Sequence, residues 1–328
     1  MNKKNLYIKD VKPGDRISDI FLVAEKSLVY SQKGAPYLNL KLKDRTGEVE
    51  GKIWEEAIEW EKKFRKGSLV WIQARALSYR NILQLSIQNL QEVMDNEYDP
   101  LDFFPAAVRP AAEMLVDLTK YMEKVTDSDY QALLNAFFND QTFSHLFQRA
   151  PAAKGFHHVC LGGLLEHTLS VVRILDFVTS HYPVINRDLL LTGGILHDIG
   201  KIHEYTYDGL IDYSDAGRLI GHIIIGVEMI DSRIVSLKNF PEQKAMELRH
   251  ILLSHHGALE YGSPKRPKTL EALIVHQVDD LDAKVNAFQE FIRSAQDESS
   301  DWTPFHRLLD RFLYKGKGMD PAEEYPTE

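Results

Sequence analysis

The sequence predicts two unlike domains, a small N-terminal β-barrel followed by an all-α helical bundle. Residues 15–93 hold short segments rich in Val, Ile, Leu, Trp and Tyr between turn signals, a pattern typical of strands. Beyond residue 110, apolar residues recur at spacings of three and four, which indicates amphipathic helices. The 328 residues leave room for about two domains, at roughly 100–200 residues each.

The barrel region contains five strand-like segments and one helix-like insertion. A charged stretch over residues 55–65 separates the third segment from the fourth, and pairs such as Lys33-Gly34 and Lys66-Gly67 mark turns. Five strands with a helix after the third match an OB-fold, a Greek-key barrel that commonly binds oligonucleotides. A barrel without a ligand is the alternative, because a fold alone does not imply a function. The five segments are residues 16–30, 36–43, 49–54, 69–78 and 82–90.

An acidic, aperiodic stretch with three prolines separates the two regions and indicates a linker. The tail carries an apolar patch that either seals the helical domain or forms a subunit contact, so a homo-oligomer is left open. The expected helices are residues 111–125, 130–138, 163–180, 187–197, 218–237, 241–254 and 269–295. We therefore expect a nucleic-acid-binding barrel over residues 1–95, a linker over 96–110, an all-α domain over 111–295 and a partly packed tail over 296–328.

Composition excludes several classes of protein. With 44% hydrophobic and 27% charged residues, and no apolar run near the roughly 18 residues of a membrane helix, we expect a soluble protein without membrane partners. The lysines near the N-terminus precede no apolar segment, so we expect no secretory signal and a cytoplasmic location. The single cysteine, Cys160, cannot form an internal disulfide and fits a reducing compartment.

Charge and histidine are distributed unevenly along the chain. The net charge is −9, but residues 1–95 hold 17 Lys and Arg against 13 Asp and Glu, whereas residues 96–328 hold 22 against 35. None of the 13 histidines precedes His145, and 12 of them lie between His145 and His276. A mildly basic half before an acidic, histidine-rich half suggests an anion-binding surface and a metal site.

The predicted strands carry aromatic and basic residues on them or at their ends. Alternation along a strand places Lys52 and Trp54 on one face, and such residues form stacking platforms and phosphate-tracking grooves in proteins that bind single strands. As the alternative, the aromatic side chains belong to the barrel core and the cations are solvated. The candidate nucleic-acid contacts are Lys41, Lys52, Trp54, Tyr79 and Arg80.

Histidines and aspartates stand within or at the ends of the apolar helical segments, where an unpaired imidazole or carboxylate is costly to bury. A single buried histidine usually bonds a backbone carbonyl. Side chains from five separate segments, however, can all point to one centre in a helical bundle, and metal ligation accounts for them most simply. The candidate ligands are His167, His197, Asp198, His222, His255, His256 and Asp279.

The donor set restricts the metal. Imidazole and carboxylate without thiolate suit Mn, Fe, Co, Ni or Zn, whereas Mg prefers oxygen ligands and a structural zinc site would use cysteines. Asp198 can give one oxygen to each of two ions, so we expect one or two ions. Two ions about 3.5–4 Å apart would clamp a phosphodiester and activate water. Lys201, one turn after Asp198, either neutralises phosphate charge during catalysis or is a surface cation at a helix end.

Five motifs in a fixed order carry a resemblance to known enzymes. They are HHVCLGGLLEHT, GGILHDIGK, GHIIIG, LSHHGALEYGSPKRP and DDLDAK. Over residues 155–290 they resemble the HD superfamily of metal-dependent phosphohydrolases. Together with the barrel, the chain is similar over nearly its whole length to the YhaM family of 3′→5′ exoribonucleases. The resemblance implies an all-α HD domain and a manganese- or cobalt-dependent nuclease that removes nucleotides from a 3′ end.

The resemblance also implies roles for single residues. The first ion would bind to His167, His197, Asp198 and Asp279. The second ion would bind to Asp198, His222, and His255 or His256. We favour His255 as the ligand, with His256 as a co-ligand or a substrate contact. His158 is a candidate phosphate contact or else a hydrogen-bond partner of a ligand, and Asp280 and Asp282 either orient ligands or lie on the surface.

The sequence departs from the HD-type cyclic-dinucleotide phosphodiesterases, which carry HHE and then GYP. Here HHG is followed by EYGSP, so that specificity is disfavoured. Lys265 and Arg266 follow in a proline-rich loop, where they either contact a phosphate backbone or form an exposed basic turn.

We therefore expect a metal-dependent 3′→5′ exoribonuclease that acts on single-stranded RNA and releases nucleoside 5′-monophosphates, with single-stranded DNA left open as a substrate. One alternative is an HD-type nucleotide phosphohydrolase or phosphodiesterase acting on a small nucleotide. The other is a nucleic-acid-binding module whose metal site is not catalytic.

Overall fold

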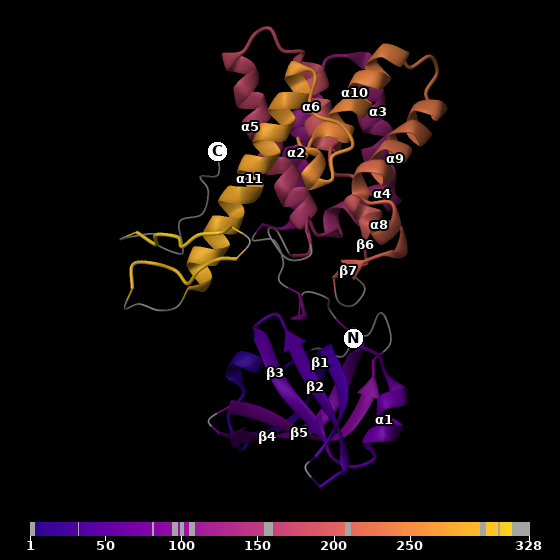
Figure 1. The fold of residues 1–328 in the computed structure, drawn as a ribbon. Helices are drawn as coiled ribbons and strands as arrows, with labels where there is room; N and C mark the ends of the chain where they lie inside the picture. The colour runs from indigo at the N-terminus through magenta and orange to yellow at the C-terminus, as the bar shows by residue number, and fades with distance from the viewer. Residues whose placement is uncertain are drawn as a thin grey trace. The chain divides into compact units, whose positions relative to one another are not determined.

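The structure is a computed structural model that falls into two compact units (Figure 1). One unit comprises Met1–Val108 with Tyr205–Ser214, and the other comprises Arg109–Glu204 with Asp215–Glu328. In the part that the structure describes, no helix combines the length and the apolarity needed to cross a membrane. The described residues are 4–31, 33–80, 82–93, 98, 102–104, 109–153, 160–206, 211–295, 300–307 and 309–316.

The first unit is a closed five-stranded barrel. Its strands are hydrogen-bonded in the order β1-β2-β3-β5-β4, with β1 also paired to β4 and with β3 parallel to β5. A short helix, α1 (Ala57–Lys63), lies between β3 and β4. This order and the position of the helix confirm the predicted OB-fold. The strands are β1 (Arg16–Tyr30), β2 (Pro36–Asp44), β3 (Gly47–Ile53), β4 (Leu69–Tyr79) and β5 (Ile82–Glu92).

Strand alternation sorts the barrel side chains into a core face and an outer face. Leu38, Leu40 and Leu42 of β2 are fully buried, and the residues between them lie on the outer face. Trp54 directly follows β3 and has 53% of its surface exposed. The alternative that Trp54 is part of the barrel core is therefore wrong.

The second unit is helical, as predicted. Elements that were not predicted are also present: helix α4, which begins after the N-cap Asp140, the short helix α7, and the two-stranded β6–β7 hairpin (Tyr205–Thr206 and Asp212–Tyr213), whose residues belong to the first unit. The helices are α2 (Ala111–Glu123), α3 (Ser128–Phe138), α4 (Gln141–Arg149), α5 (Gly163–His181), α6 (Arg187–Leu196), α7 (Lys201–Glu204), α8 (Asp215–Leu219), α9 (His222–Ser236), α10 (Glu242–Ser254) and α11 (Leu270–Ser294).

One predicted helix is broken in two. The segment over residues 218–237 was expected to be continuous, but α8 ends at Leu219 and α9 begins at His222. Gly221 between them has φ +80°, a left-handed conformation that interrupts a right-handed helix. The interruption makes His222 the first residue of α9.

Helix α6 lies at the centre of the helical unit. Every residue from Leu189 to Leu196 is buried, because α6 packs against α5, α10 and α11. A Cβ atom on Gly193 would lie 2.7 Å from Ile251 of α10, and one on Gly194 would lie 2.2 Å from Leu175 of α5. The two glycines therefore allow the neighbouring helices to approach α6 closely from two sides, and the helix leads directly to His197.

Candidate metal centre

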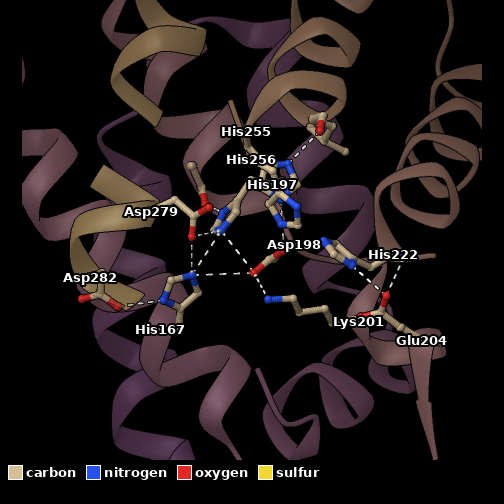
Figure 2. Close-up of polar contacts among 12 residues, drawn as sticks. His167, His197, Asp198, Lys201, Glu204, His222, His255, His256, Asp279 and Asp282 are labelled. Atoms are coloured by element: carbon tan, nitrogen blue, oxygen red, sulfur yellow. Dashed lines mark hydrogen bonds and ion pairs between the residues drawn. The ribbon is translucent and has the colours of Figure 1, made fainter. Parts of the chain in front are cut away.

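The predicted ligands lie at the ends or on the inner faces of helices that pack together, and their side chains point toward one another (Figure 2). His167 lies on α5, and Asp279 lies on α11. His197 and His255 are the C-cap residues of α6 and α10, and His222 begins α9. Asp198, which follows His197, is 1% exposed. Five segments distant in sequence thus meet at one buried centre.

The first group of ligand atoms comes from His167, His197, Asp198 and Asp279. Oδ1 of Asp279 lies 3.1 Å from Nε2 of His167 and 3.7 Å from Nε2 of His197. Oδ2 of Asp198 lies 3.3 Å from Nε2 of His197. One potential ligand atom from each of the four residues lies within 4.8 Å of every other. The structure therefore brings together the whole set predicted for the first ion.

The second group comes from His222, His255 and His256, which also meet the 4.8 Å condition. Oδ1 of Asp198 lies 3.5 Å from Nε2 of His222 and 3.5 Å from Nε2 of His255. The other oxygen of Asp198, Oδ2, faces His197 of the first group. Asp198 therefore offers one oxygen to each group, which is the arrangement that a shared ligand requires. The role of these residues as ligands stays a prediction.

The imidazoles are held so that their Nε2 atoms face the centre. The Nδ1 atoms of His197, His255 and His256 donate to backbone carbonyl oxygens at 2.7, 2.7 and 2.9 Å. The Nδ1 atoms of His167 and His222 bond carboxylate oxygens of Asp282 and Glu204 at 2.7 and 2.8 Å. Because Nδ1 carries the proton of a neutral ring held in this way, the Nε2 lone pair of each neutral imidazole faces the centre.

Several buried polar atoms at this centre lack a well-aligned hydrogen-bond partner in the described part of the chain. They are both carboxylate oxygens of Asp198 and the Nε2 atoms of His222 and His255. Leaving such an atom unsatisfied costs about 1–3 kcal/mol. Oδ1 of Asp198 and the two Nε2 atoms are electron-pair donors that face one another, so no hydrogen bond among them satisfies them, while Oδ2 forms an ion pair with Lys201. A divalent cation would satisfy these donors, and the residues present fit one or two such ions.

Electrostatics at the centre favours ionised carboxylates. Burial opposes ionisation of Asp198, but Lys201 and His197 hold the pKa of its carboxyl well below its usual range. Neighbouring imidazoles overcome burial in the same way and lower the pKa of Asp279. Burial also opposes protonation of His197, yet the two carboxylates raise its pKa to about 10. Burial and the adjacent imidazoles lower the pKa of His256 to about 3.

Lys201 is buried at the same centre. Its side chain is 8% exposed, and Nζ lies 2.6 Å from Oδ2 of Asp198. Burial lowers the pKa of Lys201, but the carboxylates of Asp198 and Asp279 outweigh it and raise that pKa. The alternative that Lys201 is a surface cation is wrong.

The residue before Lys201 is Gly200, where a Cβ atom would lie 2.0 Å from the carbonyl oxygen of His222. The close approach of α9 at this point therefore depends on a glycine.

Sequence reasoning missed the residues that hold the ligands in place. Glu204 was not recognised, and Asp282 was left open between orienting a ligand and lying on the surface. Asp282 is 8% exposed, accepts a hydrogen bond from Ser170 as well, and so orients His167. Nδ1 of His276 lies 2.8 Å from the carbonyl oxygen of His255 and ties α11 to the turn that holds that histidine. The spacing of His276, Asp279 and Asp282 along one helix face was the available signal.

The other predicted contacts do not lie among the centre's residues. Lys265 and Arg266 are exposed, and Lys265 lines a cavity of ≈ 340 Å³ with Lys268 and His250. His158 lies outside the described residues.

The barrel brings some of its predicted contacts together. The rings of Tyr37 and Trp54 stack with centroids 4.7 Å apart, and Nζ of Lys52 lies 5.5 and 5.8 Å from those centroids. We call these three residues the stacking platform. Tyr79 is also exposed, at 58%, with the guanidinium of Arg80 5.3 Å from its ring. Lys41 instead forms ion pairs with Glu25 and Glu48, so its charge is compensated.

Comparisons with known proteins agree with both units. The family model described as the HD domain matches residues 164–284. The 3′-5′ exoribonuclease YhaM of Listeria welshimeri is 32% identical over 286 residues, 87% of this chain and 90% of the relative. Its counterpart from Listeria monocytogenes is 33% identical over the same shares.

Among solved structures, the second OB-fold domain of replication protein A from Methanococcus maripaludis has a TM-score of 0.23 and 20% identity, over 28% of this chain and 96% of that domain. The assignment of the barrel depends on its strand order and not on this likeness. The coverage and identity of the Listeria relatives extend across both units. The chain therefore belongs to the YhaM family of 3′-5′ exoribonucleases, and it is a hydrolase.

Proposed function

We propose that this protein is a divalent-metal-dependent 3′→5′ exonuclease that degrades single-stranded RNA to nucleoside 5′-monophosphates. The observation that carries the proposal is the convergence of two groups of ligands on Asp198, whose two oxygens face different groups and lack aligned hydrogen-bond partners in the described structure. The named activity of the Listeria relatives supports it. We also propose a cytoplasmic location, since the chain has one cysteine.

The two groups would hold one ion each, with Asp198 between them. The donor set of imidazoles and carboxylates favours manganese, and it also suits cobalt, iron, nickel or zinc. Bound ions would supply Lewis acidity and a water molecule activated at neutral pH. The first group is His167, His197, Asp198 and Asp279, and the second is Asp198, His222, His255 and His256.

Lys201 would be the side-chain cation that acts on the reacting phosphate. Its ammonium group is buried beside Asp198, where water screens its charge weakly. It would donate hydrogen bonds to a non-bridging phosphate oxygen and stabilise the negative charge that grows during cleavage. Lys265 and Arg266, which are exposed, would contact the phosphates further along the strand, and His158 is proposed as a further phosphate contact.

The barrel would bind the RNA through its exposed aromatic and basic residues. A base can stack on the ring of Trp54 or Tyr37, while Lys52 approaches the adjacent phosphate. Tyr79 and Arg80 offer a second position with the same chemistry, and Lys41 can contribute only by leaving its two glutamates. Stacking on aromatic rings tolerates any base, so single-stranded DNA should bind as well, and the choice between RNA and DNA as a substrate is a matter for measurement.

End-labelled oligonucleotides test the proposal directly. Metal-stripped protein is given each divalent ion in turn, with 5′-labelled RNA or DNA, and the products are resolved by length and by chromatography of the released nucleotides. We expect stepwise shortening from the 3′ end and nucleoside 5′-monophosphates, with manganese among the best ions. Asp198→Ala should abolish turnover while RNA binding persists. Inert oligonucleotides together with hydrolysis of mononucleotides would show a small-nucleotide phosphohydrolase instead, and no turnover with any ion would leave only a binding module.

A further inference from the structure

We propose that Glu204 is a positioning residue that fixes His222 as an Nε2 ligand of the second group. The proposal rests on the proposed function, because it concerns the ion that this group would hold. Glu204 belongs to none of the sets of ligands predicted from the sequence, and it does not face the reacting centre itself. Its carboxylate bonds His222, and its charge also helps to raise the pKa of Lys201.

The contact between the two residues uses one oxygen atom twice. Oε1 of Glu204 accepts a hydrogen bond from the backbone N–H of His222 at 3.0 Å and lies 2.8 Å from Nδ1 of its ring (Figure 2). The first bond fixes where α9 begins, and the second fixes the rotation of the ring. Because both the backbone N–H and the ring Nδ1 of His222 are held, the direction in which Nε2 points is fixed.

That direction is toward the centre. Nε2 of His222 lies 3.5 Å from Oδ1 of Asp198, and it is buried without an aligned partner in the described structure. A carboxylate at Nδ1 keeps the proton on that atom and leaves the Nε2 lone pair facing the centre, as in many metal sites. Glu204 is itself 5% exposed, so water does not compete for its oxygen.

The position of Glu204 in the chain explains how it reaches His222. It ends the short helix α7, which starts at Lys201, and the carbonyl oxygen of Glu204 would lie 2.1 Å from a Cβ atom on Gly217 of α8. Helix α8 therefore packs closely on the backbone of Glu204, and the chain continues from α8 to His222 at the start of α9. The carboxylate also lies at the N-terminal end of α9, where the helix dipole favours negative charge.

The centre contains a natural control. Three of the five imidazoles bond backbone carbonyls through Nδ1, which substitution cannot remove. His222 depends on Glu204, and His167 of the first group depends on Asp282. Glu204 and Asp282 have the same chemistry and comparable burial, but they serve different groups. Changing each in turn separates an effect on one ion from a general effect of lost charge.

The experiment is a titration of metal-stripped full-length protein with Mn²⁺, in which electron paramagnetic resonance measures the free ion. His222→Ala should remove the binding of Mn²⁺ to the second group. We expect Glu204→Ala to weaken that binding by about 10- to 100-fold and to leave the binding of Mn²⁺ to the first group unchanged. Glu204→Gln should recover most of the affinity, because its amide oxygen still accepts the Nδ1–H. Asp282→Ala should weaken the binding of Mn²⁺ to the first group. The double variant Glu204→Ala/His222→Ala should bind no more weakly than His222→Ala.

Additional weakening by Glu204→Ala in the His222→Ala background would overturn the proposal, as would unchanged Mn²⁺ binding by folded Glu204→Ala. Should Glu204→Ala fail to fold, ¹⁵N NMR of the metal-stripped wild-type protein decides, because a proton on Nε2 and none on Nδ1 of His222 contradicts the proposed contact. The nuclease proposal fails separately: protein that binds Mn²⁺ in this pattern and leaves RNA intact would refute that activity and keep the role of Glu204.

Discussion

The stacking platform of the barrel allows a quantitative prediction about RNA binding. Trp54 is 53% exposed and stacks on Tyr37, so its removal should lower the free energy of unfolding by only about 0.5–1.5 kcal/mol. If one base stacks on its ring, Trp54→Ala forfeits about 1–3 kcal/mol of binding free energy, which corresponds to about 5- to 150-fold weaker affinity.

Two of the three residues of the platform, Lys52 and Trp54, should contribute differently to the affinity. Lys52 would neutralise one phosphate, so Lys52→Met should reduce the slope of log affinity against log salt by about 0.7. Trp54→Ala should leave that slope unchanged, since stacking displaces no counterion. Fluorescence anisotropy with a labelled single-stranded RNA, over a range of salt concentrations and with metal-stripped protein to prevent cleavage, measures both quantities.

The chain offers a matched control. Trp302 lies in the helical unit and is also 53% exposed, with its ring beside Tyr314. Trp302→Ala should leave RNA affinity unchanged. Equal weakening by Trp302→Ala and Trp54→Ala would show a nonspecific loss of aromatic surface, and wild-type affinity in Trp54→Ala would refute the assignment of the platform as an RNA contact.

Three further predictions concern the metal centre. Lys201→Met should lower kcat by about 100- to 1,000-fold with little change in KM, because the cation acts on charge that develops only during cleavage; steady-state kinetics checks this. Mn²⁺ affinity should rise with pH from neutrality to about pH 10, because the pKa of His197 is raised to about 10 and its proton must leave before Nε2 binds metal. Calorimetry in two buffers should show the released proton. Chelation should lower the free energy of unfolding by about 2.7 kcal/mol relative to protein at a free Mn²⁺ concentration 100 times its Kd, as urea denaturation can measure.

The barrel and most helices could be predicted from the sequence because their signals are local. Alternation in β2 and the turn residues define strands without knowledge of the rest of the chain. Val49 and Ile53 of β3 are buried. The residues at the alternate positions, including Lys52 and the following Trp54, therefore lie on the outer face. Helix α4 was missed although Asp140 accepts hydrogen bonds from Thr142 and Phe143, which is an N-cap pattern visible in the sequence.

The identity of the candidate ligands could be predicted from the sequence, but the hydrogen-bond partner that orients His222 could not. An imidazole inside an apolar segment needs a partner wherever it lies, so His167 and His255 were found without coordinates. Glu204 stands in a helix of four residues, which is too short to show a periodic pattern. Its contact with His222 spans 18 residues and depends on the approach of α9 to Gly200. Contacts of this kind are set by tertiary packing, which no local pattern encodes.

Helix direction gives the centre its preference for cations. His197 and His255 cap the C-terminal ends of α6 and α10, and the negative ends of both helix dipoles therefore lie at the centre. His222 enters from the opposite, positive end of a helix, and there Glu204 supplies the compensating negative charge. Lys201 and protonated His197 balance the ionised Asp198 and Asp279, so the centre offers a phosphate group no net attraction until cations are bound. Metal-stripped protein should thus hold RNA through its barrel and exclude the 3′ end from the centre, and Mn²⁺ should be needed to admit the scissile phosphate beside Lys201.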